Sequence, residues 1–166
     1  MRLFVLLLIT ISVWACAAQP VNTLQPIETS LPSTASEAYD ALVNFLTRLH
    51  TGNYADAVQL YGGPYEQLQV FNPEIDPNDH IALLAWACDH QLLQCLELRS
   101  ATFQKLVSDT YVFQVEFSNP DGSLFVLGPC CGANETEMPP VSQFEYMVTR
   151  NSNGKFVVMD LPPYVP

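Results

Sequence analysis

The fold is decided by the stretch Tyr111-Val112-Phe113-Gln114-Val115-Glu116-Phe117-Ser118, in which apolar and polar side chains alternate. This period of two predicts a β-strand with one buried face. Asn119-Pro120-Asp121-Gly122 follows as a turn, so we expect residues 124–127 to return beside the strand. A second alternating set, Phe144, Tyr146 and Val148, precedes a turn at 151–154 and a last strand beginning at Phe156. The second half of the chain is therefore predicted to be an antiparallel sheet.

The first half of the folded part has helical periods instead. Thr34-Ala35-Ser36-Glu37 has the spacing of a capping box, so a helix is expected to start near Thr34. Its predicted buried stripe consists of Ala38, Leu42, Phe45, Leu46 and Leu49. A short second helix is expected after Asn53, and a third helix after Asp76-Pro77. The inner face of the third helix would hold Ile81, Leu84, Ala85 and Cys88. Helices followed by antiparallel strands are typical of the α+β class.

This order resembles the nuclear transport factor 2-like superfamily, in the form found in small bacterial lipoproteins. The resemblance rests on the first helix, on residues 52–61 (GNYADAVQLY) and on the closing hairpin within 144–161. It implies a single domain over residues 34–166, in which a curved, cone-like antiparallel sheet packs on the helices around a pocket. Some members of the superfamily are isomerases or dehydratases, and many are not enzymes. No catalytic motif of the superfamily matches specific positions here.

The N-terminus predicts export. Arg2 is followed by the apolar run 3–13, which has the pattern of a signal peptide over residues 1–15 and is shorter than the roughly 20 residues of a spanning helix. Val13-Trp14-Ala15-Cys16 resembles the bacterial lipobox, so Cys16 is the expected lipid attachment residue, although Trp14 is larger than usual. Plain signal cleavage followed by secretion is the alternative. Residues 16–33 are rich in proline and polar residues and are predicted to be a flexible tether.

The charge balance restricts the partners. Six Lys and Arg stand against 17 Asp and Glu, giving a net charge of −11. An acidic surface repels phosphate backbones and anionic headgroups, so neither nucleic acid nor direct electrostatic docking on a membrane is expected. The lipid on Cys16 would then hold the protein at the extracytoplasmic face of a membrane or cell envelope. No cofactor-binding motif is present, and we expect no cofactor.

The cysteines other than Cys16 form an even set, which suits an oxidising compartment. They are Cys88, Cys95, Cys130 and Cys131, and they allow three connectivities. Cys88 and Cys95 would lie too far apart in one unbroken helix and could pair only if the helix ended between them. A bond between the adjacent Cys130 and Cys131 would be strained, so we favour these two reaching across to Cys88 and Cys95. The alternative to disulfide bonds is a zinc site in which His90 is an additional ligand. Adjacent cysteines do not have the usual ligand spacing, however, and no metal is expected.

Other candidate site residues have a structural alternative. Four tyrosines are pocket candidates that would equally suit the margin of a core: Tyr39, Tyr61, Tyr111 and Tyr146. Asp89-His90 has the composition of an acid–base couple, but neighbours on a helix point about 100° apart, which favours a surface pair.

The sequence therefore predicts a non-catalytic, lipid-anchored domain that binds a small apolar ligand or a partner protein. One alternative is a pocket isomerase or dehydratase in which a buried carboxylate moves a proton while a tyrosine holds the oxyanion. The other is a structural accessory subunit with a broad apolar patch on its sheet. Catalytic residues are not assigned, and the identity of the ligand or partner is left open.

Overall fold

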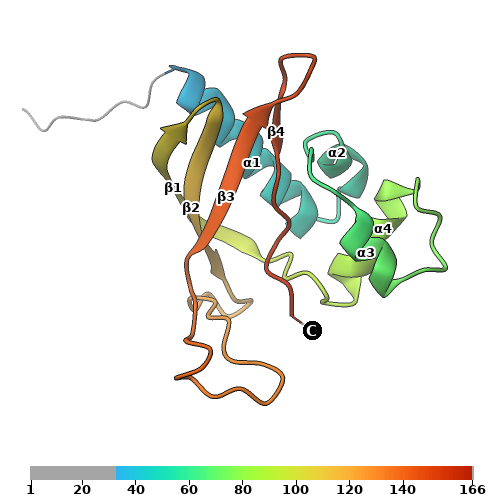
Figure 1. Ribbon diagram of the computed structural model, residues 1–166, viewed down its shortest axis with the longest axis vertical. Coiled ribbons are helices and arrows are strands. Elements are labelled where there is room, and N and C mark those ends of the chain that lie inside the picture. The colour runs from blue at the N-terminus through green and yellow to red at the C-terminus, as the bar shows by residue number, and fades with distance from the viewer. Residues whose placement is uncertain (1–32, 166) are drawn as a thin grey trace, which may run out of the picture. The chain divides into compact units, whose positions relative to one another are not determined.

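The computed structural model describes residues 33–165, and its elements confirm the α+β class (Figure 1). The signal peptide, Cys16 and all of the expected tether except Ser33 lie outside the described residues. The helices are α1 (Ser33–His50), α2 (Tyr54–Val58), α3 (Glu66–Phe71) and α4 (His80–Asp89). The strands are β1 (Glu97–Val107), β2 (Thr110–Ser118), β3 (Phe144–Arg150) and β4 (Phe156–Val158). None of the described helices is long and apolar enough to cross a membrane.

The strands form one antiparallel sheet in the order β1-β2-β3-β4, so each strand pairs with its neighbour in the sequence. Phe113 lies opposite Tyr146, and Tyr111 lies opposite Val148, which places the apolar positions of the two hairpins on one face. The alternating positions Tyr111, Phe113, Val115 and Phe117 are buried as their period predicts. The turn after β2 is also confirmed, because the Gly122 amide donates to the Asn119 carbonyl.

Helix α1 covers this apolar face and contacts all four strands (Figure 1). All five residues of its predicted stripe are buried, among them Leu42 and Phe45 at 0% exposure. The helix ends at His50, and Gly52 adopts φ 73°, a left-handed conformation that glycine accepts without strain. The shorter helices α2, α3 and α4 gather beside the β4 edge, with α4 contacting both of the others. The core therefore lies between α1 and the sheet.

Three predictions about elements are wrong. Helix α4 begins at His80 rather than after Asp76, because Asp79 caps it by accepting a hydrogen bond from the Ala82 amide at 3.0 Å. Its buried residues are Leu83, Leu84 and Ala87, and Ile81 is 46% exposed. Helix α1 does start near Thr34 as expected, at Ser33, but Thr34 therefore lies inside the helix and does not cap it. By contrast, the expected return of the chain beside β2 is confirmed in part, because Leu124 bridges Ser118 and the Phe125 amide donates to the Phe117 carbonyl at 2.9 Å, although residues 124–127 form no continuous strand.

Candidate functional site

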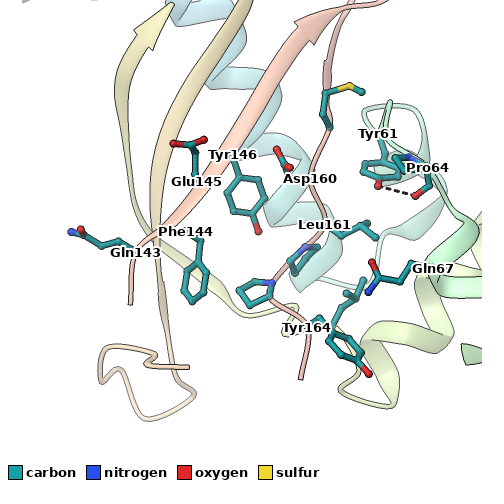
Figure 2. Close-up of a pocket in the computed structure, with 14 residues that line it drawn as sticks. Tyr61, Pro64, Gln67, Gln143, Phe144, Glu145, Tyr146, Asp160, Leu161 and Tyr164 are labelled. Atoms are coloured by element: carbon teal, nitrogen blue, oxygen red, sulfur yellow. Dashed lines mark hydrogen bonds between the residues drawn. The ribbon is translucent and has the colours of Figure 1, made fainter. Parts of the chain in front are cut away.

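A hollow opens where β3 and β4 separate. Beyond Val158 the Met159 amide still donates to the Met147 carbonyl, but the next ladder position is taken by a side chain. The Asp160 carboxylate accepts the Met147 amide hydrogen at 2.6 Å, and the chain then turns away from β3. Pro162 and Pro163 lack amide hydrogens and cannot continue the ladder. The first residues of β3 and the segment 159–164 therefore face each other across a hollow of about 480 Å³ (Figure 2).

The segment after α2 closes another side of this hollow. Residues 60–62 lie against β4, with the Val158 amide donating to Leu60 and the Gly62 amide donating to Val158, both at 2.8 Å. A Cβ at Gly62 would collide with the Val157 side chain, and one at Gly63 would collide with the Met159 carbonyl. The two glycines are therefore required for this close approach, which positions Tyr61 and Pro64 at the hollow.

Tyr146 supplies the most unusual polar atom of the hollow. The residue is only 1% exposed, and its hydroxyl has no hydrogen-bond partner. Burial, with a smaller contribution from the charge of Asp160, raises the pKa of Tyr146 well above its usual value. Figure 2 shows this hydroxyl directed between Phe144 and Leu161, into the hollow. A buried donor without a partner is unfavourable by about 1–3 kcal/mol, so a hydrogen bond to this hydroxyl would be favourable. The oxygen itself is covered by neighbouring side chains, which a bound molecule would have to displace to reach it.

Asp160 is the second polar group of interest. Burial raises the pKa of its carboxyl group, the Met147 amide opposes that shift, and the charge of Glu145 adds to it. Neither lysine nor arginine lines the hollow, whereas Asp160 and Glu145 both do. The local charge is therefore negative, which disfavours an anionic ligand.

The remaining walls are mostly apolar. Phe144, Leu161 and Leu93 line the hollow together with the buried prolines Pro162 and Pro163. The C-terminal segment is held in place by two backbone hydrogen bonds, from the Gln94 amide to Pro163 at 2.8 Å and from the Val165 amide to Leu92 at 3.0 Å. This wall is therefore fixed to the chain that follows α4.

The four tyrosine candidates fall into two groups. Tyr61 and Tyr146 line the same hollow, although the Tyr61 hydroxyl already donates to the Pro64 carbonyl at 3.1 Å. Tyr39 and Tyr111 lie elsewhere and pack against Phe113 and Phe156, with ring centroids 6.2 Å and 5.4 Å apart. Only one pair of the four thus shares a site.

The favoured disulfide connectivity is wrong. Cys88 bonds to Cys95, with their Cα atoms 5.5 Å apart. This pairing is possible because α4 ends at Asp89 and the chain reverses at Gln91, which has φ 59°. Cys130 and Cys131 do not reach across to this bond; both are free thiols in the loop between β2 and β3.

Asp89 and His90 do not form a couple. Asp89 accepts a hydrogen bond from the Tyr54 hydroxyl at 2.8 Å, whereas the His90 ring stacks on Trp86 and its Nδ1 lies 2.9 Å from the Trp86 carbonyl oxygen. Burial and the bond to Asp89 raise the pKa of Tyr54 to about 12. Within residues 33–165, no three His, Cys, Asp or Glu side chains gather closely enough to hold a metal ion.

Sequence reasoning missed Asp160 and the Leu161-Pro162-Pro163 wall. The signal was present, because an acidic residue in the short segment between the last strand and two consecutive prolines marks the point where a ladder must end. A comparison with models of known protein families finds none that matches the chain. A comparison with curated proteins likewise finds no similar one.

Proposed function

We propose that this protein is an exported, lipid-anchored binding protein that takes up a small uncharged ligand in the hollow between β3 and the C-terminal segment. Its domain would belong with the cone-like folds of the nuclear transport factor 2-like superfamily. The helix-first order and the packing of α1 across one sheet face support that assignment. Anchoring through Cys16 remains a proposal from the lipobox-like residues 13–16.

The unpartnered Tyr146 hydroxyl is the observation that carries the binding proposal. A ligand that presents a carbonyl oxygen would accept this hydrogen and relieve the unfavourable burial of the donor. An adjacent N–H or O–H of the ligand would reach the Asp160 carboxylate, while its apolar part would pack on Phe144 and Leu161. The negative local charge favours a neutral ligand over a carboxylate of the same shape.

Benzamide and benzoate are suitable probes, because they have similar size and differ in charge. The Met147 amide donates to Asp160, so its NMR signal reports directly on the hollow. We expect benzamide to shift this signal and benzoate to bind at least about tenfold more weakly, which corresponds to about 1.4 kcal/mol. If neither compound shifts the Met147 signal more than signals from β1, the hollow does not bind this class.

Tyr146→Phe removes the hydroxyl and keeps the ring. Benzamide binding should weaken by about tenfold, while the free energy of unfolding stays equal or rises by about 1 kcal/mol, because an unpaired buried donor is lost. Tyr39→Phe is the matched control outside the hollow and should bind as the wild type does. Equal losses in the two variants would contradict the proposal.

A proton-transfer enzyme is the second candidate, favoured by the raised pKa values of Asp160 and Tyr146 in one hollow. Binding has the stronger support because the Tyr146 hydroxyl has no hydrogen-bond partner. The hydroxyl is therefore not hydrogen-bonded to the Asp160 carboxylate, as an acid–base pair would be. Incubating cyclohexanone with the protein in D₂O distinguishes an enzyme from a binding protein. If the protein is an enzyme of this type, the wild type should exchange the hydrogens beside the carbonyl faster than the Asp160→Asn variant does. If it is a binding protein, the two should exchange them at the same rate.

The accessory-subunit alternative has less support. The sheet face opposite α1 carries a polar network in which the Ser100 hydroxyl and the Gln143 amide donate to the Glu116 carboxylate, both at 3.0 Å. This polar network lies on the face where the alternative requires a broad apolar patch, and it interrupts any such patch.

A further inference from the structure

A long loop of residues 119–143 connects β2 to β3 (Figure 1). It contains two adjacent free thiols, Cys130 and Cys131. Cys131 adopts φ 61° and Gly132 adopts φ 88°, so two consecutive residues are left-handed. The Ala133 amide donates to the Cys130 carbonyl at 3.0 Å and closes this tight turn. The left-handed region is uncommon for residues other than glycine, so the turn holds Cys131 in a specific orientation.

A second contact fixes the other cysteine. The Cys130 amide donates to the Met138 sulfur at 3.4 Å, which ties the turn to the far side of the loop. The two Sγ atoms then lie 2.7 Å apart, compared with about 2.05 Å in a disulfide bond. Little movement is needed to join them. Among the described cysteines they have no other partner, because Cys88 and Cys95 are bonded to each other.

We propose that Cys130 and Cys131 are a redox modification site that closes reversibly to a disulfide between neighbouring residues. This inference does not depend on the ligand proposed for the hollow beside β3. The free thiols and the closed bond would be the two states of the same turn. The turn borders a separate, partly apolar hollow of about 400 Å³ lined by Phe125, Leu127 and Val165.

The chemistry is a thiol–disulfide exchange with a small disulfide oxidant such as oxidised glutathione. Cys131 is exposed, so its thiolate attacks one sulfur of the oxidant, forms a mixed disulfide and releases one glutathione thiolate. Cys130 then loses its proton, and its thiolate attacks the Cys131 sulfur and expels the second glutathione. The protein loses two protons and two electrons, and the oxidant is reduced to two thiols.

The order of attack agrees with the surroundings of the two thiols. The pKa of Cys130 is raised, first by its hydrogen bond with the Cys131 sulfur and then by burial. Cys130 is half-buried, whereas Cys131 is exposed to an incoming oxidant. Cys130 is therefore the resolving thiol of the pair.

Peptide mapping of the full chain tests the proposal, because trypsin separates the two cysteine pairs. Cleavage at Arg48, Arg99, Lys105 and Arg150 places Cys88 and Cys95 in peptide 49–99 and Cys130 and Cys131 in peptide 106–150. The chain is equilibrated with oxidised glutathione, denatured and alkylated with iodoacetamide before digestion. We expect peptide 106–150 to lose both alkylation sites and to be lighter than its unalkylated reduced form by two hydrogen atoms. Reduced glutathione should restore both sites.

Three outcomes would overturn the proposal. Peptide 106–150 could stay doubly alkylated, it could carry glutathione without forming the internal disulfide, or it could be cross-linked to another peptide. The matched variant Cys130→Ser leaves the attacking thiol alone, so its peptide should accumulate one glutathione. If this variant also lost its alkylation site without gaining glutathione, Cys131 would have a partner other than Cys130.

Discussion

Asp160 has a carboxyl group on which burial and a backbone amide act in opposite directions. Burial is the larger effect, so the folded protein holds the proton of this group to a higher pH than the usual pKa of 3.8. The unfolded chain releases that proton near 3.8. Between these two values the folded state binds more protons, so the contribution of Asp160 to stability falls as the pH rises.

Asp160→Asn should remove this fall, because an amide oxygen can still accept the Met147 hydrogen but does not titrate. Urea unfolding at a series of pH values from below 3.8 upward measures the effect. The variant should gain stability relative to the wild type as the pH rises through this window. A constant difference across the window would show that the carboxyl group titrates alike in both states.

Glu116 provides a control, because its pKa shift has the opposite sign to that of Asp160. Hydrogen bonds from Gln143 and Ser100 hold its pKa below the usual value of 4.5, so its contribution to stability is present above 4.5 and is lost as the pH falls. In the same series Glu116→Gln should therefore lose stability relative to the wild type as the pH rises. Two variants that changed alike would mean that a general charge effect dominates.

At the scale of elements, the sequence predicted those with a clear period and missed those without one. Helix α1 and strands β2 and β3 have one apolar face, so the period alone indicates which of their residues are buried. Helix α4 reads HIALLAWACD and is apolar on nearly all sides, so its period does not specify which side is buried. The choice depends on the neighbours of α4, which the sequence does not show. Helix α3 is too short for a period, and it was not predicted at all.

The corrected face of α4 can be tested by two truncations on the same helix. Leu83 is 1% exposed and lies outside the inner face expected from the sequence, so Leu83→Ala should lower the free energy of unfolding by about 2–5 kcal/mol. Ile81 is 46% exposed, so Ile81→Ala should change it by no more than about 0.5 kcal/mol. Chemical denaturation measures both. A larger loss at Ile81 would restore the face expected from the sequence.

The candidate site was only partly predictable for a similar reason. Tyr61 and Tyr146 stood out as tyrosines, but the sequence could not separate them from Tyr39 and Tyr111. Their shared position depends on the departure of the chain from β3 at Asp160 and on the close approach of Gly62 and Gly63 to β4. Both depend on tertiary contacts between segments that are far apart in the sequence.

At the scale of the whole molecule, the net charge bears on the proposed attachment to a membrane. A chain with a net charge of −11 has no electrostatic attraction to anionic headgroups, so a lipid on Cys16 would be its membrane contact. Cys16→Ser should move the protein from the detergent phase to the aqueous phase in a detergent partition assay. Cys131→Ser, a change of the same kind in the folded domain, should leave it in the detergent phase. Wild-type protein found in the aqueous phase would indicate plain secretion instead.

The order of the sheet, β1-β2-β3-β4, also bears on how the molecule folds. Each strand meets a partner adjacent in the chain, and the β1–β2 and β3–β4 turns are short, so both hairpins can form locally before they meet. Joining them requires closure of the loop 119–143, and each doubling of a flexible loop adds only about 0.6 kcal/mol to its closure. The loop that carries the paired thiols is thus a segment whose length can change during evolution with little effect on the assembly of the sheet.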